Sequence, residues 1–156
     1  MRRALVTGGT RGIGAAIAVS LVRCGYEVSV SGRSRDAEAP PDCTYSGCDF
    51  EDSDQLRSFA GQLSMNEFDI LINNAGINKI GPLATYDPED FERIHRVNVM
   101  APFMLCRAVV PGMCERGFGR ILNITSVFGV VSKPERSAYS ASKFALFGMS
   151  RALALE

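Results

Sequence analysis

Short apolar segments alternate with longer amphipathic ones along the chain, and this alternation restricts the fold more than any other feature. The apolar segments are rich in β-branched residues and predict strands at about 3–7, 27–31, 44–48, 68–73 and 119–125. The longer segments have helical periodicity and predict helices at about 12–24, 53–64, 88–115 and 138–156. Strands that alternate with helices form a parallel sheet covered by helices on both faces. We therefore expect one doubly wound, three-layer α/β/α domain over residues 1–156.

The bulk composition disfavours several classes of partner and site. The 156 residues carry 17 Lys and Arg against 17 Asp and Glu, so there is no electrostatic case for nucleic acid or an anionic membrane. The apolar run after Met1-Arg2-Arg3 is too short for an export signal, and we expect a cytoplasmic protein. The five cysteines include no C-x-x-C pair and the single histidine is His95, which gives little support to a zinc site and favours reduced thiols.

A glycine-rich turn joins the first predicted strand to the first predicted helix, with the sequence Thr7-Gly8-Gly9-Thr10-Arg11-Gly12-Ile13-Gly14. Glycines at such a junction let the backbone turn tightly and let a pyrophosphate approach the free N–H groups of the helix N-terminus. A merely tight turn would have the same composition, but the position between strand and helix is the one that phosphate binding requires. The turn predicts a Rossmann-type sheet whose coenzyme contacts include Gly8, Thr10, Arg11, Gly12, Ile13 and Gly14.

The same turn resembles the T-G-x-x-x-G-I-G motif of the short-chain dehydrogenase/reductase family, and further motifs of that family follow in order. Asn73-Asn74-Ala75-Gly76 resembles N-N-A-G, and Tyr139-Ser140-Ala141-Ser142-Lys143 resembles Y-x-x-x-K. Asp49, Asn98 and Ser126 also stand at positions typical of the family. The resemblance covers the whole chain and is nearest to 3-oxoacyl-carrier-protein reductases and related ketoreductases.

This resemblance implies an oxidoreductase that transfers a hydride between NADP(H) and a carbonyl or secondary alcohol. It implies that Asp49 holds the adenine amino group and that Lys143 also binds the nicotinamide ribose hydroxyls. It further implies that Asn98 holds a water that relays protons from Lys143 to solvent, although a mid-helix asparagine is often simply a local backbone partner. The residues implied beside the adenosine end are Asn74, Ala75 and Gly76.

The acid–base chemistry can also be argued from the residues themselves. Tyr139 and Lys143 are four positions apart in one predicted helix and therefore share a face. A tyrosine phenol is a poor base at neutral pH, and an adjacent ammonium favours its ionised form. The pair is thus suited to exchange a proton with a substrate oxygen, to which Ser126 can donate a hydrogen bond. Taken singly, Tyr139 would more often be a half-buried aromatic residue, and Ser126 a polar cap at the end of a strand. The set of motifs as a whole favours the catalytic role.

The end of the second predicted strand bears on the choice of coenzyme. An acid there would accept hydrogen bonds from a ribose 2′-OH and repel a 2′-phosphate. The strand ends instead in Gly32-Arg33-Ser34, with no acid until Asp36. Arg33 can pair with a phosphate through two N–H groups, and Arg11 lies in the glycine turn nearby. Although arginine is also an ordinary surface residue, these features favour NADP(H).

Several apolar segments have expected positions in this fold. The run Ile121–Ile124 predicts a strand buried on both faces. The loops Phe128–Val131 and Asn78–Ile80 are expected to line the substrate pocket, and the small residues of the last helix (Ala141, Ala145 and Gly148) to pack closely against the sheet or a neighbour. Within the helix predicted at 88–115, the expected buried stripe consists of Phe91, Ile94, Ala101, Leu105 and Ala108.

The resemblance implies further strands and a substrate lid beyond the position that corresponds to Glu156. We therefore expect a sheet that lacks the final strands of the family, with the fifth strand at an edge. Two functions stay open: an active NADP(H)-dependent ketoreductase core, and a catalytically silent module that binds a nucleotide or forms oligomers. The apolar stripes of the helices predicted at 88–115 and 138–156 predict a homodimer or homotetramer.

Overall fold

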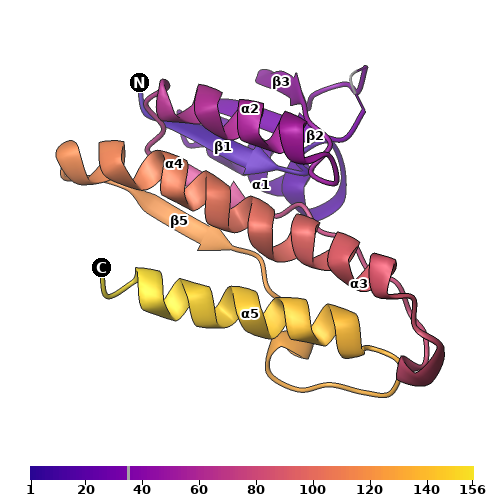
Figure 1. Cartoon of the computed structure of the whole chain (residues 1–156). Coiled ribbons are helices and arrows are strands. Elements are labelled where there is room, and N and C mark those ends of the chain that lie inside the picture. Colours follow the sequence, from indigo (N-terminus) through magenta and orange to yellow (C-terminus); the bar gives the residue numbers. More distant parts are fainter. Residues whose placement is uncertain (35) are drawn as a thin grey trace.

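The computed structural model describes residues 1–34 and 36–156, and over these residues it forms one sheet of five parallel strands with helices on both faces (Figure 1). The strand order is β3-β2-β1-β4-β5, which confirms the predicted Rossmann-type α/β/α arrangement. Each observed strand lies within two residues of its predicted bounds: Arg3–Thr7 (β1), Glu27–Gly32 (β2), Cys43–Gly47 (β3), Ile70–Asn73 (β4) and Arg120–Asn123 (β5).

The helices also agree with the sequence pattern, with one local difference. Where a single regular helix was expected at 88–115, the chain forms α3, a π-helical turn (η2) and α4 in continuous succession, because the backbone widens by one residue at the turn. Two short 3₁₀ turns are Leu83–Thr85 (η1) and Val127–Gly129 (η3). The longer elements are Gly12–Arg23 (α1), Ser53–Ser64 (α2), Pro88–His95 (α3), Arg96–Met100 (η2), Ala101–Glu115 (α4) and Ser137–Leu153 (α5).

Two apolar clusters lie on the two faces of the sheet. On one face, Val6, Val28 and Ile72 pack against α1. On the other face, Leu5 and Leu71 pack against residues of α2 and α4, such as Leu56 and Leu105, and α5 lies beside α4 in the same layer (Figure 1). The alternation of side chains along β1 and β4 thus supplies both clusters. The stretch Pro88–Glu115 is long and apolar enough to cross a membrane by length and composition alone, but several of its apolar side chains, among them Val97, Leu105 and Val109, belong to this core.

Two expectations about burial are wrong, and one alternative of a third is excluded. Phe91 does not join the buried stripe of its helix; it is 41% exposed and stacks on His95 with ring centroids 4.0 Å apart. Strand β5 is not buried on both faces, since Arg120 and Leu122, which share one face, are exposed. Ala141, Ala145 and Gly148 are exposed and do not pack against the sheet, because α5 turns its other side, with Ser142, Lys143 and Leu146, toward the protein. Their packing against a neighbouring molecule stays a prediction.

The parallel register brings the carboxyl ends of the strands to one edge of the sheet. Thr7 lies opposite Ser31, and Asn73 lies opposite Asn123. The chain reverses its direction of winding between β1 and β4, since β2 and β3 lie on one side of β1 and β4 and β5 on the other. In open α/β sheets, ligands bind in the crevice outside such a switch point. The glycine turn after β1 and the segment after β4 lie there.

Candidate active site

The glycine turn after β1 forms a tight cradle at the start of α1. Gly8 and Gly12 have φ of +62° and +58°, in the left-handed region that favours glycine. Gly14 admits no side chain, since a Cβ there would lie 2.3 Å from the Gly8 carbonyl oxygen and 2.5 Å from Asn74 Nδ2. The turn therefore packs directly on the segment after β4, and its N–H groups at the helix start are available to an anion.

Thr7 and Asn74 fasten this turn to the neighbouring strand. The backbone N–H groups of Asn74 and Ala75 both donate to the buried Thr7 Oγ1, each at 3.0 Å. In return, Asn74 Nδ2 donates to the carbonyl oxygens of Thr7 and Gly8 at 2.9 and 3.1 Å. The two crevice walls are thus joined by four hydrogen bonds. The sequence-based prediction did not include Thr7 among the site residues. The feature that could have indicated its role is its hydroxyl group, which stands directly before the first glycine of the turn.

A pocket of about 490 Å³ opens in front of this cradle. Of the residues predicted to contact a coenzyme, it brings together Gly8, Thr10, Arg11, Gly12, Ile13, Arg33, Asp49, Asn74, Ala75 and Gly76. The predicted contacts that do not line it are Gly14, which lies behind the turn, and Tyr139 and Lys143, which belong to the adjoining site described below. Residues from the ends of β1, β2, β3 and β4 therefore meet in one crevice.

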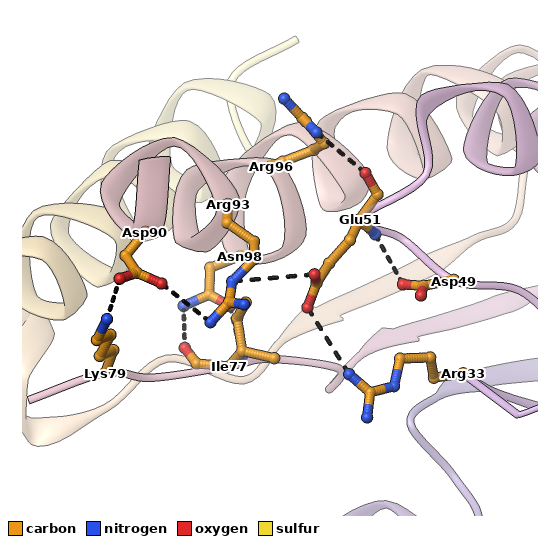
Figure 2. A network of polar contacts seen from close by, with 9 residues as sticks. All are labelled: Arg33, Asp49, Glu51, Ile77, Lys79, Asp90, Arg93, Arg96 and Asn98. Atoms are coloured by element: carbon orange, nitrogen blue, oxygen red, sulfur yellow. Dashed lines mark hydrogen bonds and ion pairs between the residues drawn. The ribbon is translucent and has the colours of Figure 1, made fainter. Parts of the chain in front are cut away.

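Asp49 and Glu51 place two carboxylates at the far wall of the pocket, after β3. The N–H of Glu51 donates to Asp49 Oδ1 at 2.9 Å, and this fixes the Asp49 side chain at the pocket edge. One oxygen of Glu51 lies 3.8 Å from Arg33 Nη1, and the other lies 3.9 Å from Arg93 Nε (Figure 2). A carboxylate that follows β3 therefore lies beside the residues that follow β2.

The sequence-based prediction missed Glu51, because this acid follows the third strand and not the second. Its signal was present in the sequence, since it stands four residues beyond the carboxyl end of β3. The carboxyl ends of adjacent parallel strands meet at one edge of a sheet, so a charge after β3 lies near a charge after β2. The register of Gly32 opposite Gly47 brings Arg33 and Glu51 into that proximity.

Tyr139 and Lys143 lie together on the buried side of α5. Lys143 Nζ lies 5.6 Å from the centroid of the Tyr139 ring and donates to the Ile124 carbonyl oxygen at 2.9 Å. The side chain is almost fully buried, and this desolvation lowers the pKa of Lys143 below its usual value because the ammonium loses hydration. A Cβ on Gly76 would lie 3.6 Å from Nζ, so the bare glycine leaves room between Lys143 and the pocket.

Asn98 lies in the π-helical turn, fully buried, and its amide is held on three sides. Its Oδ1 accepts from the Ile77 N–H at 2.8 Å, and its Nδ2 donates to the Ile77 carbonyl oxygen at 2.9 Å and to Ser142 Oγ at 3.0 Å. Ser142 Oγ in turn donates to the Tyr139 carbonyl oxygen at 2.7 Å. Asn98 therefore joins the segment after β4 to the helix of Tyr139, and Ser142 is a second link that the prediction missed.

Ser126 lies just after β5, at the start of the 3₁₀ turn η3. Its Oγ accepts a hydrogen bond from the Phe128 N–H at 3.2 Å, which leaves the hydroxyl hydrogen free to donate. The Phe128 ring meets the Tyr139 ring edge-on at 6.4 Å between centroids. A Cβ on Gly129 would lie 3.1 Å from the Lys143 carbonyl oxygen, so this turn packs closely on α5. Ser126 and Tyr139 are thus held on two segments in direct contact.

The arrangement can bind a dinucleotide and move a proton beside it. The cradle, with its two left-handed glycines and its exclusion of a side chain at Gly14, fits a pyrophosphate. Arg33 and Asp49 stand at the end of the crevice where an adenosine would lie. At the other end are a phenol, an ammonium and a hydroxyl hydrogen that is free to donate.

Comparisons with known proteins agree with this geometry. Residues 2–156 match the family profile described as short chain dehydrogenase. The chain is 37% identical to the 3alpha-hydroxysteroid dehydrogenase of Mediterraneibacter gnavus, over 98% of this chain and 66% of that protein. It is 35% identical to the 3-oxoacyl-(acyl-carrier-protein) reductase FabG of Rickettsia bellii, over 98% of this chain and 65% of that protein. The chain thus spans slightly less than two thirds of the length of these relatives.

Two similar solved structures were obtained with different coenzymes. A metagenomic short-chain oxidoreductase in complex with NADP is 35% identical, with a TM-score of 0.87 over 98% of this chain and 74% of that one. A 4-hydroxyisoleucine dehydrogenase complexed with NADH is 32% identical, with a TM-score of 0.89 over 99% of this chain and 69% of that one. Both have the fold described above.

Proposed function

This chain belongs to the short-chain dehydrogenase/reductase family of NAD(P)-dependent oxidoreductases, and we propose that it transfers a hydride between NADP(H) and a carbonyl or secondary alcohol. The observation that carries the proposal is the convergence at Gly76. A Cβ on Gly76 would lie 3.3 Å from Asn98 Oδ1 and 3.6 Å from Lys143 Nζ, while the residue itself lines the pocket of the glycine turn. The coenzyme crevice and the proton-transfer groups therefore form one continuous site.

In this proposal the bound coenzyme supplies or accepts the hydride, and the side chains handle the proton. The Tyr139 hydroxyl gives a proton to the developing alkoxide, and Ser126 donates its free hydroxyl hydrogen to the same oxygen. The Lys143 ammonium beside the ring favours the tyrosinate that forms. Because burial lowers the pKa of Lys143, its proton is held less firmly and is more readily passed on.

Asn98 would act mainly by position in this scheme. Its amide already has three partners within the protein, so it fixes Ile77 and Ser142 on either side of the site. One lone pair of Oδ1 and the second lone pair of the Ile77 carbonyl oxygen are left for a water. The proton relay implied by the family resemblance thus requires a water held by these oxygens.

The preference for NADP(H) over NAD(H) is supported by Arg33 and Arg11. Both line the pocket, and the Arg33 side chain is 74% exposed and free to turn toward a phosphate. A guanidinium binds a phosphate by charge-assisted hydrogen bonds that a 2′-OH cannot match. One carboxylate oxygen of Glu51 lies 3.8 Å from Arg33 Nη1, so the guanidinium also has an acidic partner within the protein.

For the substrate we propose a 3-oxoacyl compound or a similar ketone. Relatives at 35% identity include the 3-oxoacyl-(acyl-carrier-protein) reductase above and an acetoacetyl-CoA reductase of Shinella zoogloeoides. Apolar side chains stand exposed in the two loops expected to line the substrate pocket: Ile80, Val130 and Val131. They offer an apolar surface to the chain of such a ketone.

We also propose that the protein acts in the cytoplasm as a homodimer or homotetramer. Exposed apolar side chains on α4 and α5, among them Phe103, Phe144 and Phe147, support self-association because water solvates such surfaces poorly. Sedimentation equilibrium at micromolar concentration tests this, and a monomer with a sharp cooperative melt would contradict it.

Turnover and binding must be measured side by side to test the proposed reaction. The assay follows NADPH oxidation with a panel of 3-ketoesters, beside a titration of NADPH binding by fluorescence. Turnover that is lost in Tyr139→Phe while NADPH binding persists supports the reaction. Binding without turnover of any ketone supports the second candidate, a silent nucleotide-binding or oligomer-forming module, for which the exposed apolar side chains of α4 and α5 are the favouring observation.

A further inference from the structure

The ion pair between Arg33 and Glu51 bears directly on which coenzyme the pocket prefers. Figure 2 shows Glu51 between two guanidinium groups, with one carboxylate oxygen toward Arg33 and the other toward Arg93. Arg33 and Glu51 both line the coenzyme pocket, whereas Arg93 lies on α3 behind it. Resting on the proposed preference for NADP(H), we propose that Glu51 is a specificity-determining residue that limits this preference by competing with a 2′-phosphate for Arg33.

Glu51 is held in place by its backbone. Its N–H donates to Asp49 Oδ1 at 2.9 Å, and its carbonyl oxygen accepts from Arg96 Nη1 at 3.1 Å (Figure 2). Its side chain is only 26% exposed. The carboxylate is therefore a fixed charge at the pocket wall, whereas Arg33, with its side chain 74% exposed, is the mobile partner of the pair.

The charges near Glu51 explain how the competition works. A 2′-phosphate adds about 1.5 to 2 negative charges next to this carboxylate. To bind it, Arg33 must leave Glu51, and the remaining carboxylate repels the phosphate. Arg93 reduces that cost because it stays near the second oxygen, and it is itself held by Asp90 at 3.2 Å. A coenzyme with a free 2′-OH requires none of this, so Glu51 affects only the phosphorylated form.

The decisive variant is Glu51→Gln, which keeps the size and hydrogen-bonding capacity of the side chain and removes its charge. An exposed ion pair contributes little, so the expected gain in NADPH affinity is about 2- to 5-fold. NADH affinity should stay within error of the unaltered chain. The matched control is Glu67→Gln, which removes the same charge from an exposed position just before β4. This position lies at the amino-terminal ends of the strands, whereas the pocket lies at their carboxyl ends.

The experiment measures the dissociation constants of NADPH and NADH by fluorescence titration. The proteins compared are the unaltered chain, Glu51→Gln, Glu67→Gln, Arg33→Ala, and the double variant that combines Arg33→Ala with Glu51→Gln. The proposal expects the NADPH gain in Glu51→Gln alone, its decrease with rising salt, and its loss when Arg33 is absent. An unchanged NADPH constant, an equal gain for both coenzymes, or a gain that persists without Arg33 would overturn it. If Arg33→Ala leaves the NADPH-to-NADH ratio unchanged, the proposed coenzyme preference itself is overturned.

Discussion

Replacing Thr7 by valine is expected to loosen the crevice at its centre. Thr7 is fully buried at the end of β1, and its Oγ1 accepts the N–H groups of Asn74 and Ala75, each at 3.0 Å. Valine has nearly the same volume, so the packing against the sheet is kept while the acceptor is lost. The variant therefore isolates the hydrogen bonds that join the glycine turn to the segment after β4.

The magnitude follows from those two donors. An N–H left unpaired on burial costs about 1–3 kcal/mol, and since both amides are only half-buried we expect about 2–4 kcal/mol for the pair. That is a large fraction of the ~5–15 kcal/mol by which a domain is stable. With a urea dependence of about 2 kcal/mol per molar, the middle of the usual range of ~1–3, the unfolding midpoint should fall by roughly 1–2 M.

Urea denaturation followed by circular dichroism measures this, with Thr7→Ser as the matched control. Serine keeps the oxygen and loses one methyl group, which should cost about 1 kcal/mol. NADPH binding should weaken in the valine variant and persist in the serine variant, because Asn74 then keeps its hold on Gly8. A valine variant as stable as the serine one would refute the role given to Thr7.

Three further results are expected. Arg33→Ala should weaken NADPH binding by about 1.5–3 kcal/mol and leave NADH binding nearly unchanged, since it removes a charge-assisted pairing with the 2′-phosphate; equal losses in the titrations would contradict the assignment. Tyr139→Phe should lower kcat about 10²–10⁴-fold with coenzyme binding preserved, and near-normal steady-state turnover would place the acid–base role elsewhere. Asp52 caps the start of α2, and hydrogen bonds from the N–H groups of Gln55 and Asp54 and from the Gln55 side chain hold its pKa below the usual value. The ionised carboxylate therefore stabilises the fold at pH values above the usual carboxylate pKa, and this stabilisation is lost as the pH falls through the lowered pKa. Asp52→Ala should accordingly be less stable at neutral pH, a difference that narrows in acid denaturation curves and would be absent at every pH if the cap were unimportant.

Much of the fold could be predicted because local patterns specify it. The strand and helix periods gave bounds within two residues for all five strands, and the left-handed φ of Gly8 and Gly12 agrees with the need for glycine in that turn. The exposure of Phe91 could not be predicted from the spacing of apolar residues in its helix. That spacing shows which face of the helix is apolar, but not how much of this face the neighbouring elements cover. The π turn around Asn98 was likewise hidden, since it depends on partners 21 and 44 residues away.

The sequence by itself determined the order of the elements, the phosphate-binding turn and the residues of the candidate acid–base pair, because each of these depends on neighbours within a few positions. Only the tertiary structure decided which distant groups meet. It brought Glu51 beside Arg33 through the register of β2 and β3, and it brought Lys143 and Asn98 beside Gly76. The physical reason is that charges and hydrogen bonds act through space, over distances that sheet register and helix packing set, and a linear pattern does not specify those distances.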